Sequence, residues 1–264
     1  MIRRFLIALL LLAASVRAEA GFYTDIWYKA VESGWGVNLV QTDNFIFVTF
    51  FIYGQDGKPT WYVASLEYDS ISGSYKGDVF ATTATFFGIP WVPANTTETK
   101  VGTASFKPSA ANAYQATLAY TIPGVGSATN VIERQTLTSP ALGGSYAGGQ
   151  MGNYAGCTTA TDNGKYRDYY DLTVTHFTDN TATFVFDYRR PEGGSGYSCT
   201  LSGTLIQNGL LYRIPNATYK CTDVDTTASV SEIKQTSQGI EGRVVAPDVG
   251  GGCNEEASFS AAIR

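Results

Sequence analysis

Residues 32–65 read ESGWGVNLVQTDNFIFVTFFIYGQDGKPTWYVAS, and this stretch decides the fold. At its centre, residues 45–53 are β-branched and aromatic, a composition that favours a strand. Residues 37–42 and 60–68 flank this run and are suited to pair with it. The Asp56-Gly57 dipeptide before the second flanking run is typical of a hairpin turn. The stretch therefore predicts three antiparallel strands joined by tight turns.

The rest of the chain repeats this rhythm of short strands and turns. Further strands are predicted at 74–82, 99–107, 113–121, 127–137, 165–177, 180–188, 196–207, 210–221, 227–235, 238–246 and 255–263. Gly, Pro and Asn signals separate them, and no helical period interrupts them. Residues 84–98 are aromatic and broken by prolines, so they predict a loop that could carry binding residues. The pattern predicts an all-β chain of antiparallel barrels or barrel-like sandwiches.

The first twenty residues have the features of a signal peptide. Arg3 and Arg4 precede a short apolar run, and small residues follow for cleavage after residue 18 or 20. The run is too short for a stable membrane-spanning helix. We therefore expect an exported protein, periplasmic or extracellular, with no membrane span after cleavage. A Gly-rich segment then predicts a boundary between an N-terminal barrel domain over 21–139 and a C-terminal domain over 140–264.

The charge balance argues against two classes of partner. The chain carries a net charge of −5, and removing residues 1–20 takes away three arginines and one glutamate, which leaves −7. An acidic chain without a Lys/Arg cluster is not suited to nucleic acid or to an anionic membrane surface.

All four cysteines lie in the second half, at Cys157, Cys199, Cys221 and Cys253. An even number in an exported chain predicts two disulfides that staple the C-terminal domain. Of the three pairings, we favour Cys157–Cys199 with Cys221–Cys253, because each would close one local stretch of strands. A zinc site is the alternative, but no C-x-x-C spacing supports it. We expect no metal and no cofactor.

The strand over Phe45–Tyr53 is apolar on both faces. A barrel strand that faces water on one side should alternate, so both faces are expected to be covered. The cover could be the second domain, a ligand-filled interior, or a second copy that self-associates through this strand. A transmembrane barrel would also explain it, but residues 99–107 and 113–121 carry Lys, Thr, Ser and Gln instead of a lipid-facing pattern.

The aromatic surplus supplies the candidate ligand-binding residues. They are Trp27, Glu32, Trp35, Phe50, Trp61, Tyr62 and Trp91. Core packing is the competing role for the aromatics, because large rings are the usual core filler. A structural role is expected for Gly34, Gly36 and Arg134. In the second half, residues 166–170 (YRDYY) mix aromatic and polar side chains, a composition that suits recognition surfaces or cross-strand pairing.

Residues 32–62 carry a resemblance. The elements Glu32-Ser33-Gly34-Trp35-Gly36, Phe47-x-Thr49-Phe50-Phe51-x-Tyr53 and Gly57-x-Pro59-x-Trp61-Tyr62 resemble a module of bacterial secreted β-domain proteins. The resemblance covers about thirty residues and implies no activity. More weakly, the chain is similar to the calycins, the lipocalin- and avidin-like barrels, in which a Trp near the first strand packs on an Arg of the last. That resemblance implies two calycin-like barrels in tandem, with Trp35 against Arg134.

No residue pattern predicts catalysis. His176 is the only histidine, and its place near the end of a strand favours a surface or strand-edge role over a catalytic base. Glu32 could act as a general acid if burial against Trp raised its pKa. Alternatively, Glu32 and Ser33 satisfy backbone amides in the turn. Asp223-x-Asp225 lacks the Gly and the distal Glu of a calcium loop.

We therefore expect an exported, non-catalytic binding protein of the cell envelope. Its partner would be a small apolar or glycan ligand, or an envelope protein. The alternatives are a structural or interaction module, a secreted enzyme inhibitor, and a carboxylate-dependent hydrolase centred on Glu32.

Overall fold

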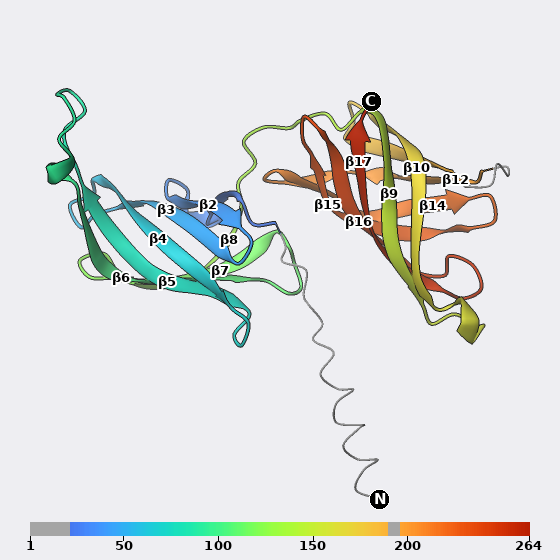
Figure 1. The fold of residues 1–264 in the computed structure, drawn as a ribbon, viewed down its shortest axis with the longest axis horizontal. Coiled ribbons are helices and arrows are strands. Elements are labelled where there is room, and N and C mark those ends of the chain that lie inside the picture. Colours follow the sequence, from blue (N-terminus) through green and yellow to red (C-terminus); the bar gives the residue numbers. More distant parts are fainter. Residues whose placement is uncertain (1–21, 190–195) are drawn as a thin grey trace, which may run out of the picture. The chain divides into compact units, whose positions relative to one another are not determined.

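The computed structural model describes residues 22–189 and 196–264, and these form two antiparallel β-barrels (Figure 1). The first barrel comprises β1 (Asp25–Tyr28), β2 (Gly36–Thr42), β3 (Phe45–Tyr53), β4 (Pro59–Asp69), β5 (Ser74–Thr83), β6 (Thr97–Pro108), β7 (Gln115–Ile122) and β8 (Gly126–Arg134). The second comprises β9 (Gly144–Ala155), β10 (Gly164–His176), β11 (Thr181–Tyr188), β12 (Ser198–Thr204), β13 (Ile206–Asn208), β14 (Leu211–Cys221), β15 (Asp225–Gln235), β16 (Gly239–Ala246) and β17 (Asn254–Ile263). Three short 3₁₀ turns, η2 (Ala30–Glu32), η3 (Pro93–Asn95) and η4 (Ala160–Asp162), lie in loops.

Strands β1 to β8 follow one another around the first barrel, and β8 closes the ring by pairing with β1. Hairpins join consecutive strands; Gly57, with φ of 72°, supplies the left-handed residue of the turn between β3 and β4. Side chains at alternate positions point inward, and Ile46, Val48 and Phe50 of β3 are fully buried.

The second barrel closes less regularly. Its strands run in the order β12-β11-β10-β9-β17-β16-β15-β14, and pairing of β12 with β14 completes the ring, while β13 extends along β14. Aromatic side chains dominate its core, including Tyr170, Phe184, Phe186 and Phe259. The all-β, two-barrel prediction is confirmed.

The predicted strands are present, with ends shifted by a few residues, and the segment 196–207 splits into β12 and β13. Two strands were missed: β1 and the Gly-rich β9. The glycines of β9 are a packing requirement, because a Cβ at Gly148 would lie 2.1 Å from the carbonyl oxygen of Ser260, and one at Gly152 would lie 2.5 Å from the ring of Tyr166. The low β-propensity of β9 therefore reflects the close approach of neighbouring strands and does not indicate a loop.

The predicted cysteine pairing is wrong. The disulfides join Cys157 to Cys253 and Cys199 to Cys221. Cys199 and Cys221 are register partners on β12 and β14, the pair that closes the ring. Cys157 follows β9 and Cys253 precedes β17, which are also neighbours. Each bond thus joins neighbouring strands of the ring or the residues beside them, one across 96 positions of sequence and the other across 22. Two such bonds indicate a protein that matures in an oxidising compartment.

The described residues divide into two compact units. One holds residues 22–24, 38–107 and 118–129, and the other holds residues 25–37, 108–117 and 130–264. The domain limits of 21–139 and 140–264 stay a prediction, and the expected signal peptide lies outside the described residues. Among the helices in the described part of the chain, none is long and apolar enough to cross a membrane.

Candidate functional site

The seven predicted ligand-binding residues do not converge on one site. Trp27 and Phe50 are fully buried core residues. Trp27 lies under the guanidinium of Arg134, 4.6 Å from the ring centroid, and is its register partner across β1 and β8. The predicted packing of Trp35 on Arg134 is therefore wrong, and Trp27 takes that place. Phe50 packs edge-on against Tyr120 inside the first barrel.

Glu32 is exposed in the turn before β2 rather than buried against a ring. Its carboxylate accepts hydrogen bonds from Lys29 and from Trp35 Nε1, the latter at 3.3 Å. The hydrogen bond from Lys29 holds the pKa of Glu32 below its usual range. A general acid needs a raised pKa, so the premise of a hydrolase centred on Glu32 is wrong. Nearby, Gly34 has φ of 113°, and a Cβ at Gly36 would lie 2.7 Å from the Trp27 carbonyl oxygen.

The remaining aromatics point in different directions. Tyr62 is half-buried, whereas Trp61 on the outer face of β4 and Trp91 in the β5–β6 loop are exposed. The expectation that both faces of β3 are covered is not met within the described residues: Phe45, Phe47, Phe51 and Tyr53 point outward and are 37–54% exposed. Self-association through this face stays a prediction.

A different group of side chains meets at one end of the second barrel. This tyrosine–carboxylate cluster consists of Tyr154, Tyr166, Tyr188, Tyr197, Tyr219, Asp168, Glu255 and the amide Gln150. They come from the ends of β9, β11 and β14, the starts of β10 and β17, and the residue before β12. Adjacent antiparallel strands alternate direction, so these ends and starts lie at the same end of the ring.

Hydrogen bonds and stacked rings connect the members of the cluster. Tyr166 donates to Glu255, and Gln150 Nε2 donates to the Tyr166 hydroxyl at 3.1 Å. Tyr188 donates to Gln150 Oε1 at 3.1 Å. The pairs Tyr154/Tyr166 and Tyr188/Tyr197 stack at 4.5 Å and 4.4 Å between ring centroids.

The second carboxylate belongs to the same network. Asp168 accepts from the Tyr197 hydroxyl at 3.4 Å. The hydroxyl of Tyr219 hydrogen-bonds to Glu255. Phenol hydroxyls thus hydrogen-bond to both carboxylates.

Burial shifts the pKa values of the cluster in one direction. Burial raises the pKa of Glu255, and the nearby charge of Asp168 adds to the rise, whereas hydrogen bonds from Tyr166 and Tyr219 oppose it. Burial also raises the pKa of Asp168. The pKa of Tyr154 rises to about 12, so its hydroxyl stays protonated at neutral pH. Perturbed groups gathered in this way mark candidate functional sites.

Neither carboxylate is neutralised by a basic side chain within residues 22–189 and 196–264. Glu255 is 3% exposed, and its hydrogen-bonding partners are tyrosines. Asp168, Tyr154, Tyr166 and Tyr197 are half-buried, so solvent reaches the outer part of the cluster. In the same described ranges, no group of three or more His, Cys, Asp or Glu side chains is placed to hold a metal ion. The arrangement offers two acidic oxygen sites inside an aromatic wall.

Both disulfides flank this end of the barrel. Cys199 lies two residues after Tyr197, Cys221 two residues after Tyr219, and Cys253 two residues before Glu255. Residues two apart in an extended strand face the same side. The bonds therefore brace the strand ends that carry the cluster.

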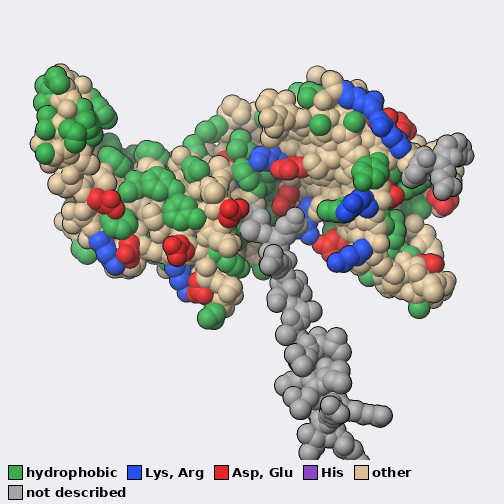
Figure 2. Space-filling model, viewed as in Figure 1, with side chains coloured by type: hydrophobic (Ala, Val, Ile, Leu, Met, Phe, Trp, Pro, Cys, Tyr) green, Lys and Arg blue, Asp and Glu red, His purple; other side chains and the backbone are tan. Residues whose placement is uncertain are grey.

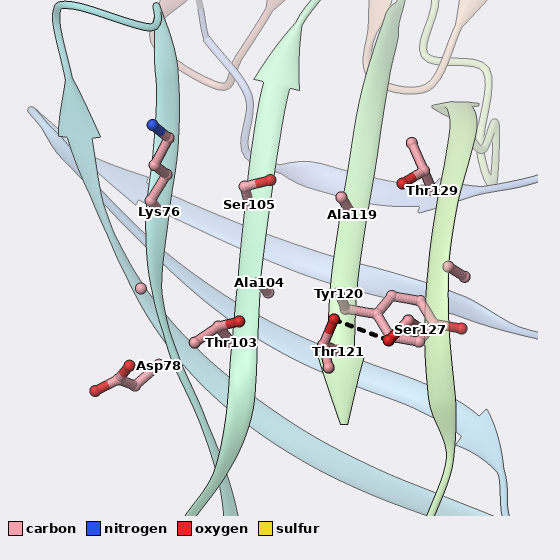
Figure 3. Close-up of a pocket in the computed structure, with 12 residues that line it drawn as sticks. Lys76, Asp78, Thr103, Ala104, Ser105, Ala119, Tyr120, Thr121, Ser127 and Thr129 are labelled. Carbon is pink, nitrogen blue, oxygen red and sulfur yellow. Dashed lines mark hydrogen bonds between the residues drawn. The ribbon is translucent and has the colours of Figure 1, made fainter. Parts of the chain in front are cut away.

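A second candidate is a groove of about 640 Å³ across β5–β8 of the first barrel (Figure 3). Hydroxyl and charged side chains line it, together with small residues and one ring: Lys76, Asp78, Thr103, Ser105, Thr121, Ser127, Thr129, Gly77, Ala104, Ala119, Ala128 and Tyr120. Ser127 donates to Thr121 at 2.9 Å, and Lys100 pairs with Asp78 at 2.8 Å. The groove is open, and its Ser and Thr hydroxyls could hydrogen-bond to a hydroxyl-rich ligand.

His176 has a structural role at the far end of the second barrel. Its Nδ1 accepts a hydrogen bond from the backbone N–H of Leu142 at 3.3 Å. Tyr146 donates to the Leu142 carbonyl at 2.9 Å, and Leu142 is fully buried. The segment before β9 is thus fastened against this end of the barrel.

Sequence reasoning singled out residues 166–170 but not the cluster. Alternation places Tyr166, Asp168 and Tyr170 inside and Arg167 and Tyr169 outside, so the run is not a single surface. The period-two alternation of a strand could have shown from the sequence that these residues divide between two faces. Glu255, Gln150 and Tyr219 could not be added to it, because they lie on strands whose neighbours the sequence does not specify.

Comparisons with known proteins assign no family. No family model and no curated protein matches the chain. Among solved structures, a "putative outer membrane protein" from Bacteroides fragilis aligns over 90% of this chain and 94% of its own, at 12% identity and a TM-score of 0.32. A TM-score this low supports no conclusion about function.

Proposed function

We propose that this chain is an exported, non-catalytic binding protein, periplasmic or extracellular, whose second barrel takes a small organic cation such as an amine. One observation carries the proposal: Asp168 and Glu255 face the barrel interior among five tyrosines, with no Lys or Arg partner in the described part of the chain.

The physical argument begins with the cost of burying an acid. A buried carboxylate without a cation either takes up a proton or is destabilised by the loss of water. A bound ammonium group would restore the charge balance and donate hydrogen bonds to the carboxylates. The tyrosine faces add attraction, because a cation over an aromatic ring is stabilised by the ring quadrupole.

The solvent access and the rigidity of the tyrosine–carboxylate cluster also support amine binding. The half-buried Tyr154, Tyr166, Asp168 and Tyr197 form the outer part of the cluster, and Glu255 lies deeper. An amine would enter past the tyrosines and reach Glu255. The flanking disulfides hold the strand ends before the ligand arrives, which reduces the ordering cost of binding.

The test is calorimetric titration of the oxidised protein with n-butylamine and with n-butanol, its uncharged counterpart. We expect heat of binding for the amine and none for the alcohol. Glu255→Gln and Asp168→Asn should each weaken amine binding by about tenfold or more, since each removes one charge-assisted contact.

The chain offers matched controls for both substitutions. Glu256 neighbours Glu255 but points outward and pairs with Arg243 at 2.7 Å. Asp171 lies on the same strand as Asp168 and forms an exposed ion pair with Arg189. Glu256→Gln and Asp171→Asn should leave amine binding unchanged. Equal binding of the alcohol, or equal losses in the controls, would show that the cluster is only a structural network.

A second candidate function is glycan binding in the groove across β5–β8. The supporting observation is its lining of Ser and Thr hydroxyls beside Asp78. Titration with soluble oligosaccharides should shift the amide resonances of Thr103, Thr121 and Thr129, and the double variant Thr103→Val/Thr129→Val should abolish the shifts. If no oligosaccharide shifts these resonances, glycan binding in the groove is excluded, and the amine proposal is unaffected.

A further inference from the structure

The loop between β5 and β6 exposes large apolar side chains. It extends beyond the strands that it joins (Figure 1), and hydrophobic side chains cover much of it (Figure 2). Phe86 is 75% exposed, Phe87 95%, Ile89 55% and Trp91 53%. Single exposed apolar residues are ordinary, but four within six positions at one tip form a patch that calls for an explanation.

The loop is built to hold these side chains outward. Buried Thr85 donates through its hydroxyl to the Val92 carbonyl at 2.9 Å and accepts from the Val92 N–H at 3.0 Å. The Asn95 side chain also donates to the Thr85 hydroxyl, at 3.3 Å. Pro90 and Pro93 restrict the backbone further. These bonds tie both arms of the loop together, so the exposed tip is a defined structure.

The same end of the first barrel carries three more exposed rings. Phe51 and Trp61 are register partners, each 54% exposed, and Tyr53 is 50% exposed. β3 ends and β4 begins at the end of the ring where β5 ends and β6 begins. We call the set Phe51, Tyr53, Trp61, Phe86, Phe87, Ile89 and Trp91 the aromatic rim.

The rim is electrically neutral. Residues 84–96 contain no charged side chain. The nearest charges in sequence are Glu98, Asp56 with Lys58, which pair at 3.5 Å, and Lys100, which pairs with Asp78 at 2.8 Å. Both lysines are matched by an acid, so the rim offers no excess of basic charge to attract an anionic partner.

We propose that the aromatic rim docks on the surface of an electrically neutral lipid bilayer. A projecting apolar tip can insert into the deformable surface of a bilayer. A protein partner would need a matching groove to cover the same tip. Trp, Tyr and Phe are the side chains that partition to the headgroup level of a bilayer. The acidic mature chain and the lack of basic residues at the rim favour neutral over anionic lipid.

The test is co-sedimentation of the full mature protein with phosphatidylcholine vesicles. The double variant Phe87→Ser/Ile89→Ser should reduce vesicle binding by about tenfold or more, because both side chains would enter the apolar layer. Both positions are exposed, so circular dichroism should show the fold unchanged. Added salt should not weaken binding, since no charge drives it.

A control and a second readout sharpen the test. Ile71 is 97% exposed in the turn between β4 and β5, at the opposite end of the barrel, and Ile71→Ser should bind as the parent does. Quencher-labelled lipid should quench the fluorescence of the parent more than that of Trp91→Phe. The proposal is overturned by absence of parent binding or by a requirement for anionic lipid. It is equally overturned if the double variant abolishes a concentration-dependent dimer and leaves vesicle binding intact, since the rim would then cover a second copy.

Discussion

Removal of the Cys157–Cys253 bond is expected to destabilise the second barrel more than removal of the Cys199–Cys221 bond. The bonds join residues 96 and 22 positions apart. The chain-entropy model assigns about 4.7 kcal/mol to the longer loop and about 3.4 kcal/mol to the shorter one. Because the inner bond shortens the outer loop to about 75 residues, the first value falls to about 4.5 kcal/mol. The double variants Cys157→Ala/Cys253→Ala and Cys199→Ala/Cys221→Ala should therefore differ by about 1 kcal/mol.

The assay is guanidinium unfolding followed by near-ultraviolet circular dichroism and by tryptophan fluorescence. All four tryptophans lie in the first ninety-one residues, so fluorescence follows the first barrel, whereas the tyrosines lie in both halves of the chain; the second barrel is the transition that appears in the circular dichroism alone. The free energies can be compared only where the slope against denaturant is the same for both variants and the parent.

The result also distinguishes the pairings. If the bonds instead joined Cys157 to Cys199 and Cys221 to Cys253, they would contribute about 4.0 and 3.7 kcal/mol, and each double variant would break both of them, so the two losses would be equal. A larger loss for Cys199→Ala/Cys221→Ala would refute the entropic reasoning, as would equal losses in a protein whose pairing is the observed one. Peptide mapping under non-reducing conditions gives the pairing independently.

Three further predictions concern buried groups. Arg134→Ala should lower the free energy of unfolding by about 3–5 kcal/mol, because Asp25 is then buried without its cation. The Asp25 carboxylate lies 3.1 Å from the Arg134 guanidinium. Adding Asp25→Ala should restore part of the loss in the same denaturation assay. Burial raises the pKa of Glu255 above its ordinary 4.5. The stabilisation from protonated Glu255 is therefore fully present below pH 4.5 and is lost as pH rises through the raised pKa. The free energy of unfolding of the parent should fall relative to that of Glu255→Gln as pH increases, and a constant difference would contradict this. Gly152→Val should displace the Tyr166 ring, which lies 2.5 Å from the added Cβ, and should weaken butylamine binding as well as stability, whereas unchanged calorimetry would show that Tyr166 is not part of the site.

The strands could be predicted because their signals are local. Residues 45–53 were assigned with the observed limits, since β-branched and aromatic residues alternate there between a buried and an exposed face. β9 could not be predicted, because its glycines are required by close contacts with Ser260 and Tyr166 on other strands. The loop over 84–96 was recognisable from its prolines, but the role of Thr85 as its anchor depends on contacts within the folded loop.

The candidate site was less predictable than the fold. The choice of Trp27 and Phe50 rested on residue type, and both fill the core. The choice of Glu32 rested on its nearness to Trp35 in sequence, and Lys29 on the same turn reverses the expected direction of its pKa.

The sequence by itself determined that this chain is all-β, where most of its strands lie and which side chains share a face. Those properties depend on residues one or two positions apart. Only the tertiary structure decided that Cys199 meets Cys221, that Trp27 lies on Arg134, and that Glu255 joins Asp168 among tyrosines from five other strands or their ends. The physical reason is ring closure: which strands become neighbours in a closed barrel depends on how the whole sheet is ordered, and no local pattern records that order.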